Sequence, residues 1–276
     1  MEGLVAQVSE AKGRFLSRSR QDERKGAFAL CLIDGMSFAE ESVTAALHWA
    51  LDDIPMIGGS AGDDMNFRET SLILDGEAGH DCAILVLVGT DAAFHIFKTD
   101  NFVPTDDKLV VTRSDPARRV VLEFNAAPAA EEYARTIGMD PASLSSLSFA
   151  SHPLVVRVGG EFYCRSVQKV NDDGSLSFYC AIDDGIVMTV AEPTGMARTT
   201  RDAFDEVRKR IGTIDVVLGF DCVLRQVDAR NRQVTQTLSQ IYRDNHVIGF
   251  NTYGEQYISM HLNQTFTGIA FAAPTP

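Results

Sequence analysis

The sequence holds six histidines, the side chains best suited to bind a metal: His48, His80, His95, His152, His246 and His261. No two of them stand in an H-E-x-x-H or H-x-H pattern, so their spacing does not predict a site with several histidine ligands. A haem iron needs only one protein ligand, and a single histidine is therefore compatible with haem. For each histidine taken alone, a structural role is the expectation.

Cys222, His261 and Asn263 occur in the chain order of a cysteine–histidine–asparagine hydrolase. The residues around Cys222 carry no feature that would activate its thiol. A buried cysteine on a helix is the favoured interpretation. Cys164 and Cys180 also lie in apolar runs, where burial raises the pKa of a thiol and makes it unreactive.

Two polar stretches follow predicted strands. The Gly-rich stretch Gly58–Asp64 could bring backbone amides close to an anion, but it lacks a Gly-Lys-Ser/Thr ending and its two aspartates would repel phosphate. A tight turn, with Asp63 or Asp64 bonded to the local backbone, is favoured. The stretch Tyr253–Gln256 follows the strand VIGFNT, and either a pocket or a hydrogen-bonded polar turn is expected there.

Short strands and interspersed helices must position these residues. Ser37 and Glu40 form a capping-box pattern that predicts the start of a helix. Gly138 predicts the end of a helix that begins near Pro128, and Asn171–Gly174 predicts a hairpin turn. Residues 139–152 are Ser-rich and are expected to form an irregular linker. The predicted fold is mixed α/β (α+β), with two modules of mainly antiparallel or mixed sheets and flanking helices.

The overall composition excludes several classes of partner. With 25 basic and 38 acidic residues the net charge is −13, which argues against binding to nucleic acid or an anionic membrane. The number of cysteines, five, is odd and they are widely spaced, which is typical of a protein whose cysteines stay reduced. The longest apolar run, Ala83–Val88, is far shorter than the roughly 20 residues that span a bilayer. The N-terminus has no apolar signal core, so a cytoplasmic protein is predicted.

Motifs spread from about residue 33 to residue 270 carry a family resemblance. They occur in the expected order, which makes the set far more specific than any single motif. The sequence resembles the FIST sensory family, a two-part input module of bacterial signalling, and is most similar to its haem-binding, nitric oxide-sensing (NosP-type) subgroup. The matching stretches are Ile33–Gly35, Glu40–Glu41, Gly58–Asp64, Val110–Thr112, Pro128–Ala134, His152–Arg157, Asp173–Leu176, Cys180–Asp183, Asp221–Cys222 with Arg225, Gly249–Gln256 and Met260–Gly268.

The resemblance also predicts a domain division. In the family, the N-terminal module normally begins well upstream of the segment matching Ala27–Asp64, whereas here only 26 residues precede it. The expectation is therefore a partial FIST N-terminal module over residues 1–145, without its first part, and a FIST C-terminal module over residues 146–276.

The function implied by the resemblance is that of a non-catalytic sensor. It would bind haem, take up nitric oxide at the iron, and act on a partner signalling protein, a histidine kinase or a cyclic-di-GMP enzyme. No nucleic acid or membrane is expected as a partner, and a homo-oligomer is left open. The alternative is a FIST sensor for another small ligand, such as an amino acid. A cysteine–histidine enzyme is the third hypothesis.

Site residues follow from the same resemblance. The first candidate for the iron ligand is His152, in the corner between the two modules, and the second is His261, beside Asn263. Arginine pairs with carboxylates through two parallel hydrogen bonds, so three arginines are candidates for the haem propionates: Arg157, Arg165 and Arg225. Tyr253 and Glu255 would close the pocket.

Overall fold

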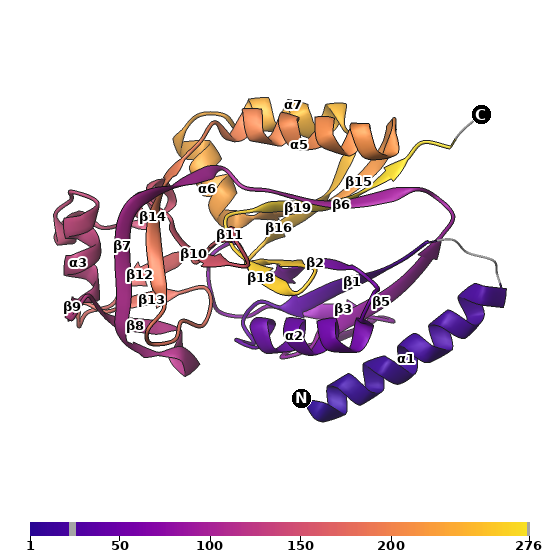
Figure 1. Cartoon of the computed structure of the whole chain (residues 1–276), viewed down its shortest axis with the longest axis horizontal. Coiled ribbons are helices and arrows are strands. Elements are labelled where there is room, and N and C mark those ends of the chain that lie inside the picture. The colour runs from indigo at the N-terminus through magenta and orange to yellow at the C-terminus, as the bar shows by residue number, and fades with distance from the viewer. Residues whose placement is uncertain (22–25, 275–276) are drawn as a thin grey trace.

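Figure 1 shows the computed structural model of the chain, which describes residues 1–21 and 26–274. Two β-sheets are stacked with helices on both outer faces, and a curled third sheet stands at one end. The combination of mixed and antiparallel sheets with flanking helices confirms the predicted fold class. Within the described residues, no helix is both long enough and apolar enough to span a bilayer.

The first sheet of the sandwich has the strand order β18-β17-β2-β1-β5. Its strands are β1 (Gly26–Asp34), β2 (Met56–Ala61), β5 (Ala83–Thr90), β17 (Glu255–Tyr257) and β18 (Met260–Leu262). Ala29, Cys31 and Ile33 alternate along β1 and are buried beneath α2 (Glu40–Leu51) and α1 (Glu2–Gln21). This alternation is the two-residue period of a strand, and it places the apolar face of β1 against the helices.

The second sheet has the order β16-β15-β19-β6 and lies against the first. Its strands are β6 (Phe94–Thr99), β15 (Ile214–Cys222), β16 (Val247–Thr252) and β19 (Phe266–Ala272). Phe28 and Ile57 of the first sheet pack against Phe220 and Ile269 of the second. Helices α5 (Met196–Ile211) and α7 (Thr235–Asp244) cover its outer face, with α6 (Val223–Asn231) at one end.

Both sheets share one strand topology. β1 is parallel to β2 and antiparallel to β5, just as β15 is parallel to β16 and antiparallel to β19. In each parallel pair a glycine faces the neighbouring carbonyl. A Cβ on Gly58 would lie 1.7 Å from the oxygen of Cys31, and one on Gly249 would lie 1.8 Å from the oxygen of Gly219. The glycine at position 58 therefore serves strand packing within β2, and the Gly-rich stretch is largely strand rather than turn.

The curled sheet has the order β11-β10-β14-β7-β8-β13-β12, with β9 paired to β8. Its core is closed by Tyr133 of α3 (Ala129–Thr136) and Phe149 of α4 (Ser146–Ser151). The strands are β7 (Phe102–Asp115), β8 (Val120–Phe124), β9 (Ala127–Pro128), β10 (Leu154–Val158), β11 (Glu161–Cys164), β12 (Val167–Val170), β13 (Leu176–Phe178) and β14 (Val187–Pro193). A small hairpin of β3 (Leu72–Leu74) and β4 (Glu77–Gly79) and the single turns at Pro116–Arg118 and Pro141–Ser143 complete the described elements.

Strands from distant parts of the chain share sheets. β17 and β18 join the N-terminal sheet, β6 joins the C-terminal one, and β7 and β8 belong to the curled sheet with β10–β14. The predicted boundary between the two modules, at residues 145 and 146, stays a prediction. In space, each half of the chain supplies strands to the other.

Several local predictions are confirmed and others are wrong. Gly138 ends α3 with a φ of +70°, and Gly174 turns the chain between β12 and β13. The predicted irregular linker at 139–152 instead contains α4, which begins with a Ser145–Ser148 capping box. The stretch after Thr252 forms β17 and β18, which pair with each other and with β2.

Candidate functional site

Buried polar side chains gather on and just after the β17–β18 hairpin. We call Gln256, His261 and Asn263, together with Glu41 and Arg119, the polar centre. Gln256 and His261 stand opposite each other across the hairpin. Residues that pair directly across antiparallel strands point to the same face, so both side chains lie on the face that α2 covers. Gln256 Nε2 donates to Ser60 Oγ at 3.0 Å and lies 3.2 Å from His261 Nδ1.

These contacts decide the protonation of His261. The two amide hydrogens of Gln256 go to Ser60 and to His261 Nδ1, so Nδ1 accepts and Nε2 carries the hydrogen. Burial lowers the pKa of His261, although Glu40 and Glu41 act in the opposite direction. The ring is therefore neutral, with its Nε2–H left as a free donor.

Three buried polar atoms of the centre have no hydrogen-bond partner among the described residues: Gln256 Oε1, His261 Nε2 and Asn263 Oδ1. Gln256 and Asn263 are fully buried, and His261 is 5% exposed. An unpaired buried polar group costs about 1–3 kcal/mol, so native proteins rarely keep several together without a ligand or water to pair them. An ordered water or a small polar molecule would supply the partners that these atoms lack.

A buried ion-pair network borders the centre. Arg119 Nη2 lies 2.6 Å from Glu40 Oε2 and 2.7 Å from Glu41 Oε2, while Arg119 Nη1 donates to the carbonyl of Tyr179. Glu41 also accepts from the backbone N–H of Ala181. Burial acts to raise the pKa of Glu41, but His261 and Arg119 outweigh it and the pKa is lowered. The network ties the start of α2 to the 179–181 segment of the curled sheet.

The predicted capping box at Ser37 and Glu40 is wrong. α2 begins at Glu40 with Ala39 as its N-cap, no side chain caps it, and Ser37 donates to the carbonyl of Asp34 instead. The Glu40 carboxylate instead pairs with the buried Arg119 guanidinium, so it is not available to cap the helix.

Three of the seven predicted site residues meet at this centre: His261, Arg165 and Tyr253, whose carbonyl accepts from Asn263 Nδ2 at 3.4 Å. Arg165 Nη1 donates to the carbonyl of His261 at 3.3 Å. His152 takes no part in the contacts of the centre. It ends α4, its Nδ1 lies 3.3 Å from the carbonyl of Ser148, and its own carbonyl accepts from Tyr133.

Arg225 is committed to the interior. Its guanidinium bonds to Asp221, Asn101 and Thr200, and the residue is 1% exposed. Burial opposes its charge, but Asp221 outweighs this and raises its pKa. All of these contacts hold the guanidinium within the second sheet, where it cannot bind a propionate.

Tyr253 anchors the loop after β2. Its hydroxyl bonds to the carboxylate of Asp63 and accepts from the backbone N–H of Met65. Asp63 also accepts from the backbone amides of Phe67 and Arg68, so the prediction that it bonds the local backbone is confirmed.

Glu255 is fully buried between the two sheets. The hydroxyls of Thr252 and Thr265 donate to its carboxyl group, the latter at 2.6 Å. Burial raises its pKa to about 8, although both hydroxyls act to lower it. The side chain is therefore a neutral acid at neutral pH and fills the core beside the polar centre.

The cysteine–histidine arrangement does not form. Cys222 is fully buried in a cluster with Tyr179 and Tyr253, and burial raises its pKa well above the ordinary value. No hydrogen bond joins it to His261 in the part of the chain that the structure describes. The thiol thus lacks both the base and the exposure that a nucleophile needs.

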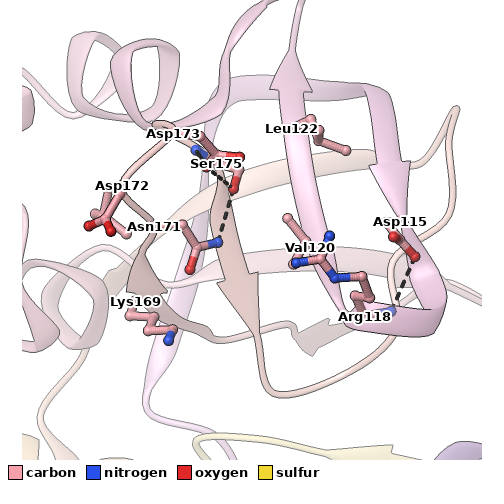
Figure 2. Close-up of a pocket in the computed structure, with 10 residues that line it drawn as sticks. Asp115, Arg118, Val120, Leu122, Lys169, Asn171, Asp172, Asp173 and Ser175 are labelled. Carbon is pink, nitrogen blue, oxygen red and sulfur yellow. Dashed lines mark hydrogen bonds between the residues drawn. The ribbon is translucent and has the colours of Figure 1, made fainter.

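Two grooves lie on the curled sheet. The first, which we call the basic groove, has a volume of about 630 Å³ and holds Lys108, Arg157 and Arg165. It reaches the polar centre through Arg165 and Ala181, which contact His261 and Glu41. The second, the aspartate groove of Figure 2, measures about 400 Å³ and holds Arg118 and Lys169 among Asp115, Asp172 and Asp173.

Sequence reasoning missed Arg119 and Gln256 as site residues. Arg119 directly follows Arg118 in a short turn, and no local pattern sets it apart. Glu40, Glu41 and Gln256 do fall inside the motifs that carry the family resemblance. Their place within these motifs was the one sign in the sequence that they belong to a site. Only the fold brings residues 40 and 261 together.

Comparison with known proteins covers nearly the whole chain. Residues 2–127 match the model of the FIST N domain, and residues 129–258 match that of the FIST C domain. The first match starts at residue 2, so α1 lies inside the similarity rather than before it. An uncharacterized protein of Methanocaldococcus jannaschii is 24% identical over 253 residues, which cover 79% of this chain and 49% of the relative. The chain thus spans about half the length of this relative.

Proposed function

The chain belongs to the FIST family, whose domains are sensory modules, and we propose that it is a non-catalytic sensor whose small ligand binds at the polar centre. The observation that carries the proposal is the set of three unpartnered buried polar atoms on Gln256, His261 and Asn263. Sites of this kind bind ligands through a few convergent polar groups in an otherwise packed interior.

The free atoms define the chemistry of the ligand. Gln256 Oε1 and Asn263 Oδ1 are acceptors, whereas His261 Nε2–H is a donor. A matching molecule offers at least two hydrogen-bond donors and one acceptor. An amino acid or a similar amine- or amide-bearing metabolite has this combination.

Ligand binding here acts on the contact between α2 and the curled sheet. Glu41 bonds both Arg119 and Ala181, and the pKa values of Glu41 and His261 depend on each other. A ligand that pairs with His261 changes the electrostatics of that contact and favours one arrangement of α2 over another. The receiving protein would be a histidine kinase or a cyclic-di-GMP enzyme, as the resemblance implies.

A thermal-shift screen of a metabolite panel, followed by calorimetric titration of each hit, tests the proposal. Gln256→Met removes the free acceptor at nearly constant volume and is expected to weaken binding about tenfold. Gln236→Met, on the exposed face of α7, is the matched control and should leave the affinity unchanged. Silence across the panel, or equal affinities in the two variants, would refute the ligand site.

The residues present do not fit a haem in this structure. A Cβ on Gly254 would lie 2.7 Å from His261 Nε2, so the Gly254 backbone packs closely against one side of this ring. Arg157 lies in the basic groove and Arg225 in the core, so the predicted propionate partners are not assembled around one histidine.

Haem titration of the purified protein tests the point directly. We expect no saturable Soret change. A saturable change that is lost in His261→Ala or in His152→Ala, but kept in the surface control His246→Ala, would restore haem and nitric oxide as the ligands.

A further inference from the structure

Three cations line the basic groove without an acidic partner. Lys108 Nζ donates to Thr189 Oγ1, Arg157 Nε lies 3.4 Å from the carbonyl of Gly160, and Arg165 Nη1 contacts the carbonyls of Cys164 and His261. No ion pair with a carboxylate reaches any of the three within residues 1–21 and 26–274. In a chain of net charge −13, such a group of cations is a local exception.

Apolar residues also line the groove. Phe162 and Val187 share the face of the sheet that Lys108 and Arg157 occupy, and Val156, Val158 and Ile186 complete the lining. Val158 and Val187 remain 47% and 48% exposed, and the Arg157 guanidinium stacks over the Phe162 ring at 5.8 Å from its centre. Exposed apolar area next to unpaired positive charge is matched by a ligand with an apolar body and an anionic head.

We propose that the basic groove is a second binding site, for a small amphipathic carboxylate. Arg157, Arg165 and Lys108 pair with the carboxylate, and the apolar body lies along Phe162 and Val187. Guanidinium groups suit this role because they bind carboxylates through two hydrogen bonds while stacking on apolar surface. This site lies outside the polar centre, which it borders through Arg165 and Ala181. The test of carboxylate binding does not depend on the proposed function, whereas the coupling between the two sites rests on it.

The aspartate groove shows why cations alone do not make such a site. Figure 2 places Arg118 and Lys169 in the same groove as Asp115, Asp172 and Asp173. Three carboxylates there outnumber two cations, whereas the basic groove holds three cations and only Asp183. An anion is repelled from the first groove and attracted to the second.

The basic groove contacts the polar centre, so binding at one site affects binding at the other. Arg165 lines the groove and also donates to the carbonyl of His261, and Ala181 lines it while its N–H binds Glu41. A carboxylate that draws Arg165 into the groove weakens its contact with His261. Occupancy of the groove therefore alters the affinity of the polar centre, and by linkage the reverse also holds.

Calorimetric titration with decanoate, below its micelle concentration, tests the site on the full chain. Saturable binding at one site is expected. Arg157→Ala and Lys108→Ala should each weaken it about tenfold, the loss of one charge-assisted contact. Arg118→Ala, in the aspartate groove, is the matched control and should bind as the wild type does.

Further probes separate the carboxylate from its alternatives. Decanol and decyltrimethylammonium share the apolar chain and should not bind, and acetate shares the head and should bind far more weakly. Decanol binding as tightly as decanoate, decanoate affinity unchanged in Arg157→Ala, or association only with anionic phosphatidylglycerol vesicles would each overturn the proposal. Circular dichroism of each variant shows that a loss of binding does not come from unfolding.

Discussion

Because Glu255 is buried, the stability of this protein should fall as the pH rises, and the substitution Glu255→Gln should remove this dependence. Its folded pKa is about 8 because the side chain is fully buried, against an ordinary value of 4.5. Between these two values the folded chain holds the proton and the unfolded chain releases it. Stability then falls by about 1.4 kcal/mol for each pH unit, because the unfolded state binds fewer protons.

The destabilisation due to Glu255 increases with rising pH. It is absent below pH 4.5 and reaches about 5 kcal/mol of destabilisation once the pH passes 8. Typical domains are stable by only about 5–15 kcal/mol, so the effect is large enough to measure. Glu255→Gln keeps the shape of the side chain but does not titrate. Its amide oxygen can accept from one of the Thr252 and Thr265 hydroxyls while its NH2 donates to the other.

Urea unfolding at a series of pH values measures the effect. From about pH 5 to pH 8 the wild type should lose about 4 kcal/mol more of its unfolding free energy than Glu255→Gln does. Glu131→Gln, exposed on α3, is the control and should follow the wild type. Parallel pH profiles for the wild type and Glu255→Gln would show that Glu255 is ionised in the folded protein, and the reasoning from burial would be refuted.

Three further outcomes follow from the buried contacts. Arg119→Ala leaves Glu40 unpaired in the interior and should cost about 3–5 kcal/mol in urea unfolding, whereas Arg14→Ala, in an ion pair with both partners exposed, should cost less than about 1 kcal/mol. Gly58→Ala places a Cβ against the Cys31 carbonyl and should separate β1 from β2, seen as a lower melting temperature, while Gly3→Ala on α1 should have no such effect. Cys222 should resist iodoacetamide in the native protein and react only after denaturation, and native alkylation detected by mass spectrometry would contradict its burial.

Local patterns predicted the local features well. Asn171–Gly174 turned out to be a hairpin turn and Gly138 a helix end, since both depend on backbone conformations that glycine adopts easily. The mixed fold class also followed from strand-length apolar runs between helices. Each of these features involves residues only a few positions apart.

Long-range pairing overturned the local reading elsewhere. Ser37 and Glu40 fit a capping box, yet Arg119, 79 positions further along, takes the Glu40 carboxylate into a buried ion pair. The stretch after Thr252 looked like a polar turn because its strands are three residues long and carry polar side chains. Pairing with β2, almost 200 positions earlier, makes it a strand.

What the sequence by itself determined is the inventory: an acidic chain with reduced cysteines, FIST motifs in order, and a set of polar residues near its C-terminal end. What only the tertiary structure decided is which of those residues meet. His261 pairs with Gln256 and borders Glu41 because β17 and β18 add to the edge of an N-terminal sheet. Such pairing depends on backbone hydrogen bonds that any residue can make, so the side chains nearby give no local sign of it, and the unpartnered atoms of the polar centre become visible only in the folded chain.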